Sequence, residues 1–243
     1  MICNLRFVEE AESHRPRGTR QRVCGTILLA LCLTLLWNLP GGAAEPATVT
    51  FSLDFPGSDP DHYSISVQSD GHAHYECSAK ISDGADDREN YQTDFLVTDA
   101  TRTRVFDLAA QAGYFSGKID SGNRKLAFTG AKKLAYTDAQ RNFTADYNFS
   151  PQPAVQQLTT LFQNLAATLE FGRHLAYYHH YQKLALDEEL KQMEDAARRG
   201  DLAELQAVRP ILQEIFDDAS VINVVRARAQ RIMEMGKTAS SAH

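Results

Sequence analysis

The sequence predicts an α+β fold, in which an antiparallel sheet domain with one packed helix precedes a helical C-terminal half. Apolar and polar residues alternate in short runs between 47 and 149, which is typical of half-buried strands. One helical stretch, at about 100–112, interrupts this alternation. From Pro151 onward the apolar residues recur with the period of a helix.

Residues 1–44 are predicted to be a signal peptide. Four arginines between positions 15 and 22 precede an uncharged apolar run from Val23 to Leu39, and the small residues Gly41–Ala44 follow. The core of this run is about sixteen residues, shorter than the roughly 20 that span a bilayer. Cleavage after Ala44 is therefore favoured over retention as an anchor. We expect the remainder to be exported, to the periplasm or the extracellular side of a bacterial envelope.

Removal of this leader changes what the composition allows. The leader holds five of the 25 basic and three of the 31 acidic residues, so residues 45–243 carry 20 basic and 28 acidic side chains, formally −8. A chain this negative lacks the basic surface that nucleic acids and anionic membranes attract, so neither is expected as a partner. Of the four cysteines only Cys77 remains, which leaves no internal disulfide and makes packing the source of stability.

The sheet domain is predicted to span 45–150 and to contain a hairpin whose register follows from the face pattern. Apolar residues alternate with polar ones on both sides of Gly71, at Tyr63, Ile65, Val67, Ala73, Tyr75 and Cys77. A three-residue loop over 69–71 pairs Val67 with Ala73 and keeps all six on one face, whereas a two-residue loop would mix the faces. Such a loop needs a left-handed residue at its last position, where Gly71 stands.

The other elements of this domain follow from periodicity and capping. Thr98 or Asp99 can cap the helix at about 100–112, and Gly113 can end it. Tyr136 and Phe143 are expected to face each other across a turn. Further strands are expected at about 48–55, 91–97, 124–129, 132–137 and 142–149.

Residues 151–199 are predicted to form a long helix with a break. Ser150 is a good N-cap, and Pro151 suits the first helical position. The apolar pattern continues almost to Gly200, which is far beyond the length of a typical helix. We therefore expect a break near Phe171-Gly172.

Residues 200–235 are predicted to form a helical hairpin, and 236–243 a disordered tail. The apolar stripes of the two helices are wider than mutual contact can hide. They are therefore expected to dock on the rest of the chain and to leave a residual patch for a protein partner or for self-association. The arginines expected to flank this patch, facing Glu204, Glu214 and Asp217, are Arg226, Arg228 and Arg231.

Two segments resemble known families. The hairpin Y-x-I-x-V-x-x-D-G-x-x-x-Y, from Tyr63 to Tyr75, is similar to a motif of a family of uncharacterised exported bacterial sheet domains. That resemblance implies export and no known activity, and the chain departs from it at 57–61, where many relatives would have cysteines. The pattern P-x-L-x-x-I from Pro210 to Ile215, with Val225-Arg226, resembles one HEAT-type helical hairpin.

The metal-ligand candidates are His62, His72, His74 and Glu76. Strand residues two apart share a face, so His72, His74 and Glu76 project together, with His62 on the partner strand. Imidazole and carboxylate groups suit zinc or copper. The alternative is an exposed polar hairpin face that happens to contain histidines.

For each remaining candidate residue, a structural role is favoured over a chemical one. The run Tyr177–Tyr181, with His179 placed on the apolar stripe, could relay protons but is more typical of packing with polar tips in water. Cys77 shares the core-facing side of its strand, where thiols behave as small hydrophobes. The acidic run 83–87 lacks the alternating ligands of a calcium loop.

These observations predict a non-enzymatic exported envelope or periplasmic protein that acts by protein–protein contact. The alternative is a metal- or small-ligand-binding module that uses the face of His62, His72 and His74. A hydrolase is a third possibility, without a nucleophile motif to support it. No cofactor is expected.

Overall fold

Six strands form one antiparallel sheet in the order β4-β3-β2-β1-β5-β6, which confirms the predicted α+β class. The computed structural model describes residues 45–80 and 88–241, and side chains up to Lys237. The predicted signal peptide and the acidic run 83–87 lie outside the described residues. The strands are β1 (Thr48–Asp54), β2 (His62–Gln68), β3 (His72–Lys80), β4 (Arg88–Leu96), β5 (Ala131–Thr137) and β6 (Asn142–Tyr147).

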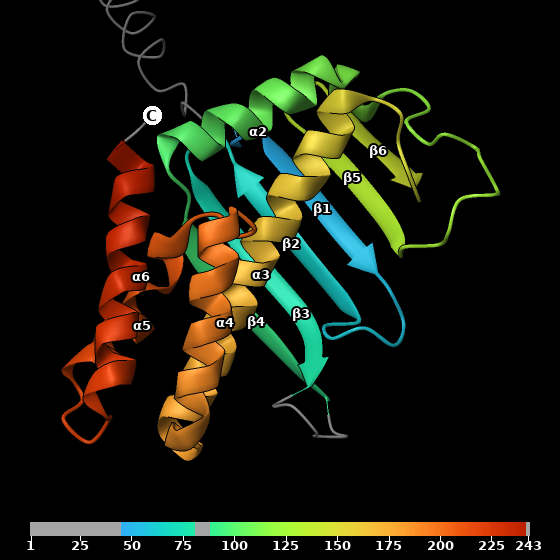
Figure 1. Cartoon of the computed structure of the whole chain (residues 1–243). Helices are drawn as coiled ribbons and strands as arrows, with labels where there is room; N and C mark the ends of the chain where they lie inside the picture. The colour runs from blue at the N-terminus through green and yellow to red at the C-terminus, as the bar shows by residue number, and fades with distance from the viewer. Residues whose placement is uncertain (1–44, 81–87, 242–243) are drawn as a thin grey trace, which may run out of the picture. The chain divides into compact units, whose positions relative to one another are not determined.

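Helices lie on only one face of this sheet in the described part of the chain (Figure 1). Two of them, α2 (Asp99–Gln111) and α3 (Pro153–Tyr181), pack directly on the strands. Phe162 of α3 stacks on Phe51 of β1, with ring centroids 5.5 Å apart. The opposite face carries the polar side chains of each strand, which remain half-buried or exposed.

The predicted hairpin register is confirmed. Val67 pairs with Ala73, Ile65 with Tyr75, and Tyr63 with Cys77. Gly71 has φ of 95° and its amide donates to the carbonyl of Gln68 at 3.0 Å, so the loop has the left-handed residue that the parity of the strands requires. The pairing of Tyr136 with Phe143 is also confirmed.

The remaining helices pack on α3 and on one another instead of on the sheet (Figure 1). They are α4 (Leu186–Arg199), α5 (Arg209–Asp217) and α6 (Asn223–Ser241), with the short 3₁₀ helices η2 (Lys183–Ala185) and η3 (Leu205–Val208). The other 3₁₀ helix, η1 (Gly113–Phe115), follows α2 and packs on β5 and β6. The apolar stripes of α5 and α6 dock within the chain as predicted, since Leu212, Ile215 and Ile232 are fully buried.

Residues 201–208 join the helical half to the sheet domain. Thr98 caps α2, its hydroxyl accepting from the amide of Thr101 at 3.3 Å. The carboxylate of Glu204 in turn accepts from the amide and hydroxyl of Thr98, at 2.9 and 2.7 Å. An acid at a helix N-terminus is stabilising, so this contact favours the docked position of the connection.

The break in the long helix was predicted in the wrong place. Helix α3 runs unbroken through Gly172 and ends at Tyr181. A Cβ at Gly172 would lie 2.4 Å from a methyl of Val208, so glycine is required there for close packing of η3. One glycine costs a helix only about 1 kcal/mol, which this packing outweighs.

Three other boundaries differ from expectation. Helix α3 begins at Pro153, not Pro151, so Ser150 is not its cap. Residues 124–129 form no strand, because their backbone groups bond to Asn148 and Lys132. The helical backbone of α6 continues to Ser241, into the segment 236–243 that was predicted to be disordered, and Gly236 lies against Leu205.

Replacement of Gly71 by alanine should destabilise the protein by about 1 kcal/mol, because a Cβ is disfavoured at positive φ. A Cβ there would meet only the carbonyl oxygen of Val97 at 3.7 Å, so backbone strain alone produces the cost. Gly117→Ala, at a position with open space and no positive φ, is the control. Urea unfolding that ranks the two variants equal would contradict the assignment.

Candidate functional site

The four predicted metal ligands lie on the polar face of the sheet but do not converge. His72, His74 and Glu76 follow one another along β3, while His62 stands opposite Ser78 at the far end of the hairpin. Nδ1 of His62 lies 3.2 Å from Asp54, and Nδ1 of His74 lies 2.6 Å from Asp94. Within residues 45–80 and 88–237, no three His, Cys, Asp or Glu side chains are placed to hold a metal ion. The metal site stays a prediction without support from this geometry.

A buried polar cluster lies instead between β3 and α3. Glu170 and Arg173, three apart in α3, form an ion pair with Nη2 and Oε2 2.7 Å apart, and both side chains are nearly buried. The hydroxyl of Tyr75 donates to Oε1 of Glu170 at 2.6 Å, and the thiol of Cys77 donates to the same oxygen at 3.3 Å. Arg173 also donates to the carbonyl of Lys80 at 2.7 Å, so this residue pair ties α3 to β3 at three points.

The same cluster extends from α3 to α4 through His174. Its Nε2 lies 3.0 Å from Nη2 of Arg173, and its Nδ1 lies 3.0 Å from a carboxylate oxygen of Glu189. A guanidinium can only donate, so Nε2 of His174 accepts from Arg173. Nδ1–H then donates a hydrogen bond to Glu189. Sheet, α3 and α4 are joined by one continuous chain of hydrogen bonds.

Burial determines the chemistry that this cluster can perform. Burial and the nearby charge of Glu170 raise the pKa of the Cys77 thiol to about 12, and raise the pKa of Tyr75 above its ordinary value. Both carboxylate oxygens of Glu170 already accept hydrogen bonds. A protonated thiol is a poor nucleophile, and an occupied carboxylate is a poor general base. The properties of the cluster therefore favour a structural role, in which it holds β3, α3 and α4 together.

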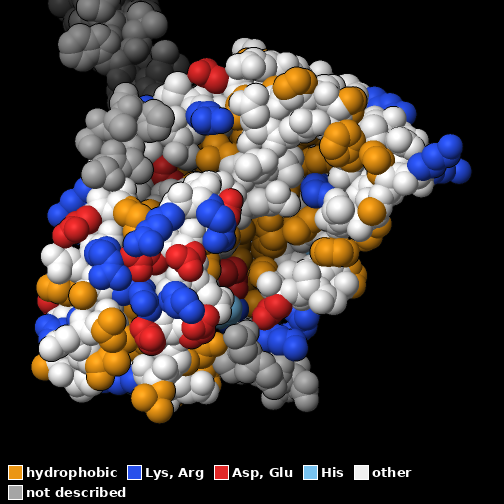
Figure 2. Space-filling view, viewed as in Figure 1, with side chains coloured by type: hydrophobic (Ala, Val, Ile, Leu, Met, Phe, Trp, Pro, Cys, Tyr) orange, Lys and Arg blue, Asp and Glu red, His pale blue; other side chains and the backbone are white. Residues whose placement is uncertain are grey.

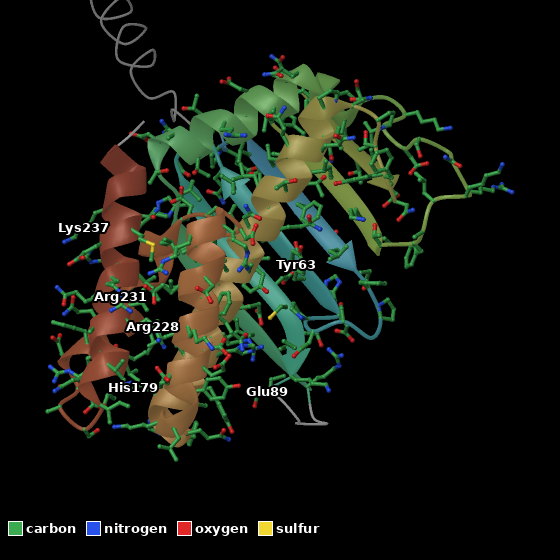
Figure 3. All side chains as sticks on the ribbon, in the orientation of Figure 1. Tyr63, Glu89, His179, Arg228, Arg231 and Lys237 are labelled. Carbon is green, nitrogen blue, oxygen red and sulfur yellow. The ribbon has the colours of Figure 1, made fainter. Side chains whose placement is uncertain are left out.

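A second cluster joins α4 to α6 and corrects the predicted partners of the arginines. Glu194 is buried and contacts Arg231 at 2.9 Å, Arg198 at 2.6 Å and Arg228 at 3.2 Å. The hydrogen bonds from Arg231 are the main reason that the pKa of Glu194 lies below its usual value. Arg228 and Arg231 lie between α6 and α4 in Figure 3. Glu204, Glu214 and Asp217 were the wrong partners, because Arg228 and Arg231 face the acids of α4, and Arg226 binds a backbone carbonyl of α5.

The charged groups of Arg226 and of the cavity beside this cluster are already engaged within the protein. Arg226 donates to the carbonyl of Phe216 at 2.6 Å. A cavity of about 370 Å³ is lined partly by Glu194, Arg198 and Arg231, whose charges already pair with one another.

The residue of the aromatic run at the end of α3 that is buried differs from the prediction. Tyr178, not His179, lies on the buried stripe. His179 is half-buried and its Nε2 lies 3.0 Å from Asp218, which also receives Lys183 at 2.6 Å. The hydrogen bond from Lys183 is the largest reason that the pKa of Asp218 is well below its ordinary value.

These contacts bring two apolar segments together at one end of the helical half. Nζ of Lys183 lies 2.6 Å from Oγ of Ser220, so the segment after α3 lies against the turn between α5 and α6. Large apolar side chains beside this contact are exposed to solvent, Leu184 almost completely at 99%. We call this surface the apolar tip, and it consists of Tyr181, Leu184, Ile222 and Val224.

Neither the scan against protein-family models nor the search of curated proteins finds a match for this chain. Among the described residues, no helix combines the length and apolar character that crossing a bilayer demands.

Replacement of Glu170 by alanine should destabilise the protein by about 3–5 kcal/mol, because it leaves Arg173 buried without its counter-ion. Glu188→Ala is the matched control, since Glu188 pairs with Lys191 in a largely exposed ion pair at 3.6 Å. That control should cost less than about 1 kcal/mol in urea unfolding. Equal losses would show that the buried pair has no special role.

The Cys77 thiol should be inert in the folded protein. At pH 8 a pKa of about 12 leaves roughly a thousandfold less thiolate than the ordinary pKa allows. In the chain from residue 45, which contains no other cysteine, Ellman's reagent should react slowly until urea unfolds the protein. Because this pKa is raised on folding, stability should also fall as the pH rises above about 9. Rapid labelling of the native protein would contradict the placement of Cys77.

Proposed function

We propose that this chain is a non-enzymatic exported protein that acts by protein–protein contact through the apolar tip. The observation that carries the proposal is the exposure of four large apolar side chains at one end of the helical half. Large contiguous apolar patches on soluble proteins commonly mark interaction sites, because their exposure to water is unfavourable. The expectation of export comes from the sequence of residues 1–44.

The tip is held in a fixed shape, as a recognition surface requires. One oxygen of Asp218 contacts His179 of α3 and Lys183 of η2, and its other oxygen accepts from the amide and hydroxyl of Ser220, at 2.8 and 2.7 Å. These contacts order the segments that carry Leu184 and Ile222 before any partner arrives. Preorganisation lowers the entropy cost of association.

Two further observations favour contact over catalysis and over nucleic-acid binding. The buried cluster around Glu170 has its acids, thiol and imidazole already occupied by hydrogen bonds. The formal charge of −8 for residues 45–243 favours a protein partner over a nucleic acid. The partner is either another envelope protein or a second copy of this chain.

A photo-crosslinking residue placed at Leu184 should yield one discrete higher-mass species in the cell envelope, and Ile222→Asp in the same chain should abolish it. The same crosslinker at Leu96, which is 61% exposed on β4, is the control. The mass of the product distinguishes a second copy from another protein. Equal crosslinking from both positions, or products unaffected by Ile222→Asp, would refute the proposal.

A further inference from the structure

The connection between η1 and β5 has a charge opposite to that of the whole chain. Residues 117–133 contain five basic side chains and one acid, Asp120. Fields of exposed charges are screened within about 10 Å at ordinary salt, so distant acids do not cancel this local charge. The formal total of −8 therefore conceals a basic surface.

Three of these five cations are available to a ligand. Lys132 is buried, and its ammonium group donates to Thr129, Gly130 and Asn148. Lys133 lies 3.8 Å from Asp146. Of the five, Lys118, Arg124 and Lys125 are exposed and form no ion pair within 4 Å among the residues that the structure describes, although the charge of Lys118 acts on nearby Asp120.

Large apolar side chains are exposed on the same connection and beside it. Phe128 is 59% exposed, and its ring makes an edge contact with Phe55 at 6.0 Å between centroids. Leu126 is also exposed, two residues before Phe128. Phe149 joins them, since its carbonyl accepts from the amide of Ser121 at 2.8 Å. Figure 2 shows basic and hydrophobic side chains together at this edge of the molecule.

Hydrogen bonds hold this connection in one conformation although it forms no strand. The side chain of Asn148 accepts from the amide of Thr129 and donates to the carbonyl of Ala127, each at 3.0 Å. Asp120 accepts from the amides of Asn148 and Gly122, at 2.9 and 2.6 Å. The exposed apolar side chains are thus displayed by a fixed backbone, not by a loose loop.

We propose that this basic and aromatic corner binds the surface of an anionic lipid bilayer. Leu126 and Phe128 enter the interface between headgroups and acyl chains, while Lys118, Arg124 and Lys125 contact lipid phosphates. Apolar and cationic side chains lie side by side here, and a bilayer surface offers both environments within a few ångströms. An acidic protein surface would satisfy the cations but would place the apolar side chains against charged groups.

The test is co-sedimentation of residues 45–243, which form one compact unit, with phosphatidylcholine vesicles that contain or lack one-third phosphatidylglycerol. Binding should require the anionic lipid and should weaken as salt rises. Replacing Lys118, Arg124 and Lys125 by glutamine should weaken it about 100-fold, at about fivefold for each charge. Leu126→Ser with Phe128→Ser should weaken it by at least about tenfold.

Leu184→Ser with Ile222→Ser is the matched control, because it removes similar apolar groups from the tip and should leave vesicle binding unchanged. Absence of binding to anionic vesicles would overturn the proposal. So would binding that both corner variants retain. Corner-dependent binding to polyglutamate without binding to vesicles would overturn it in favour of an acidic protein. If tip crosslinking is absent while corner-dependent vesicle binding is present, the proposed function fails and this inference is supported.

Discussion

The ion pair between Glu170 and Arg173 is the interaction on which the arrangement of the two halves depends. Its carboxylate receives Tyr75 and Cys77 from the sheet, and its guanidinium reaches the carbonyl of Lys80 and the ring of His174. Two buried charges are costly unless their remaining donors and acceptors are satisfied. Here the sheet satisfies one side directly, and on the other side His174 contacts Arg173 and is itself held by Glu189 of α4. The pair is stable only when all three elements are in place.

Helix α3 packs on both the sheet and the helical half because its small and polar residues lie where the backbone of the helical half comes close. Gly172 admits Val208, and the hydroxyl of Thr168 donates to the carbonyl of Ala203 at 2.7 Å. Towards the sheet, the fully buried Phe162 stacks on Phe51. The segment that docks on α3 then caps α2 through Glu204. The helical half is therefore a layer of the same unit.

Local rules predicted the elements whose determinants lie close together in sequence. The hairpin register followed from parity and Gly71, and the start of α2 followed from Thr98. The break assigned to Gly172 was wrong, because the role of that glycine depends on Val208, 36 positions later. The buried cluster escaped prediction for a related reason: the spacing of Glu170 and Arg173 is visible in the sequence, but Tyr75 is 95 positions away. The histidine face was predictable from strand parity, yet parity does not show that the rings of His62 and His74 each contact a separate carboxylate.

The two exposed apolar surfaces lie at opposite ends of α3. Phe149 comes four residues before its first turn, and Tyr181 is its last residue. A helix of 29 residues is about 40 Å long, so neither surface can cover the other. Because the cluster around Glu170 fixes α3 to the sheet, the distance between the surfaces is set by a rigid element. A protein held to a bilayer by the corner would therefore keep its tip, at the far end of α3, free to meet a partner.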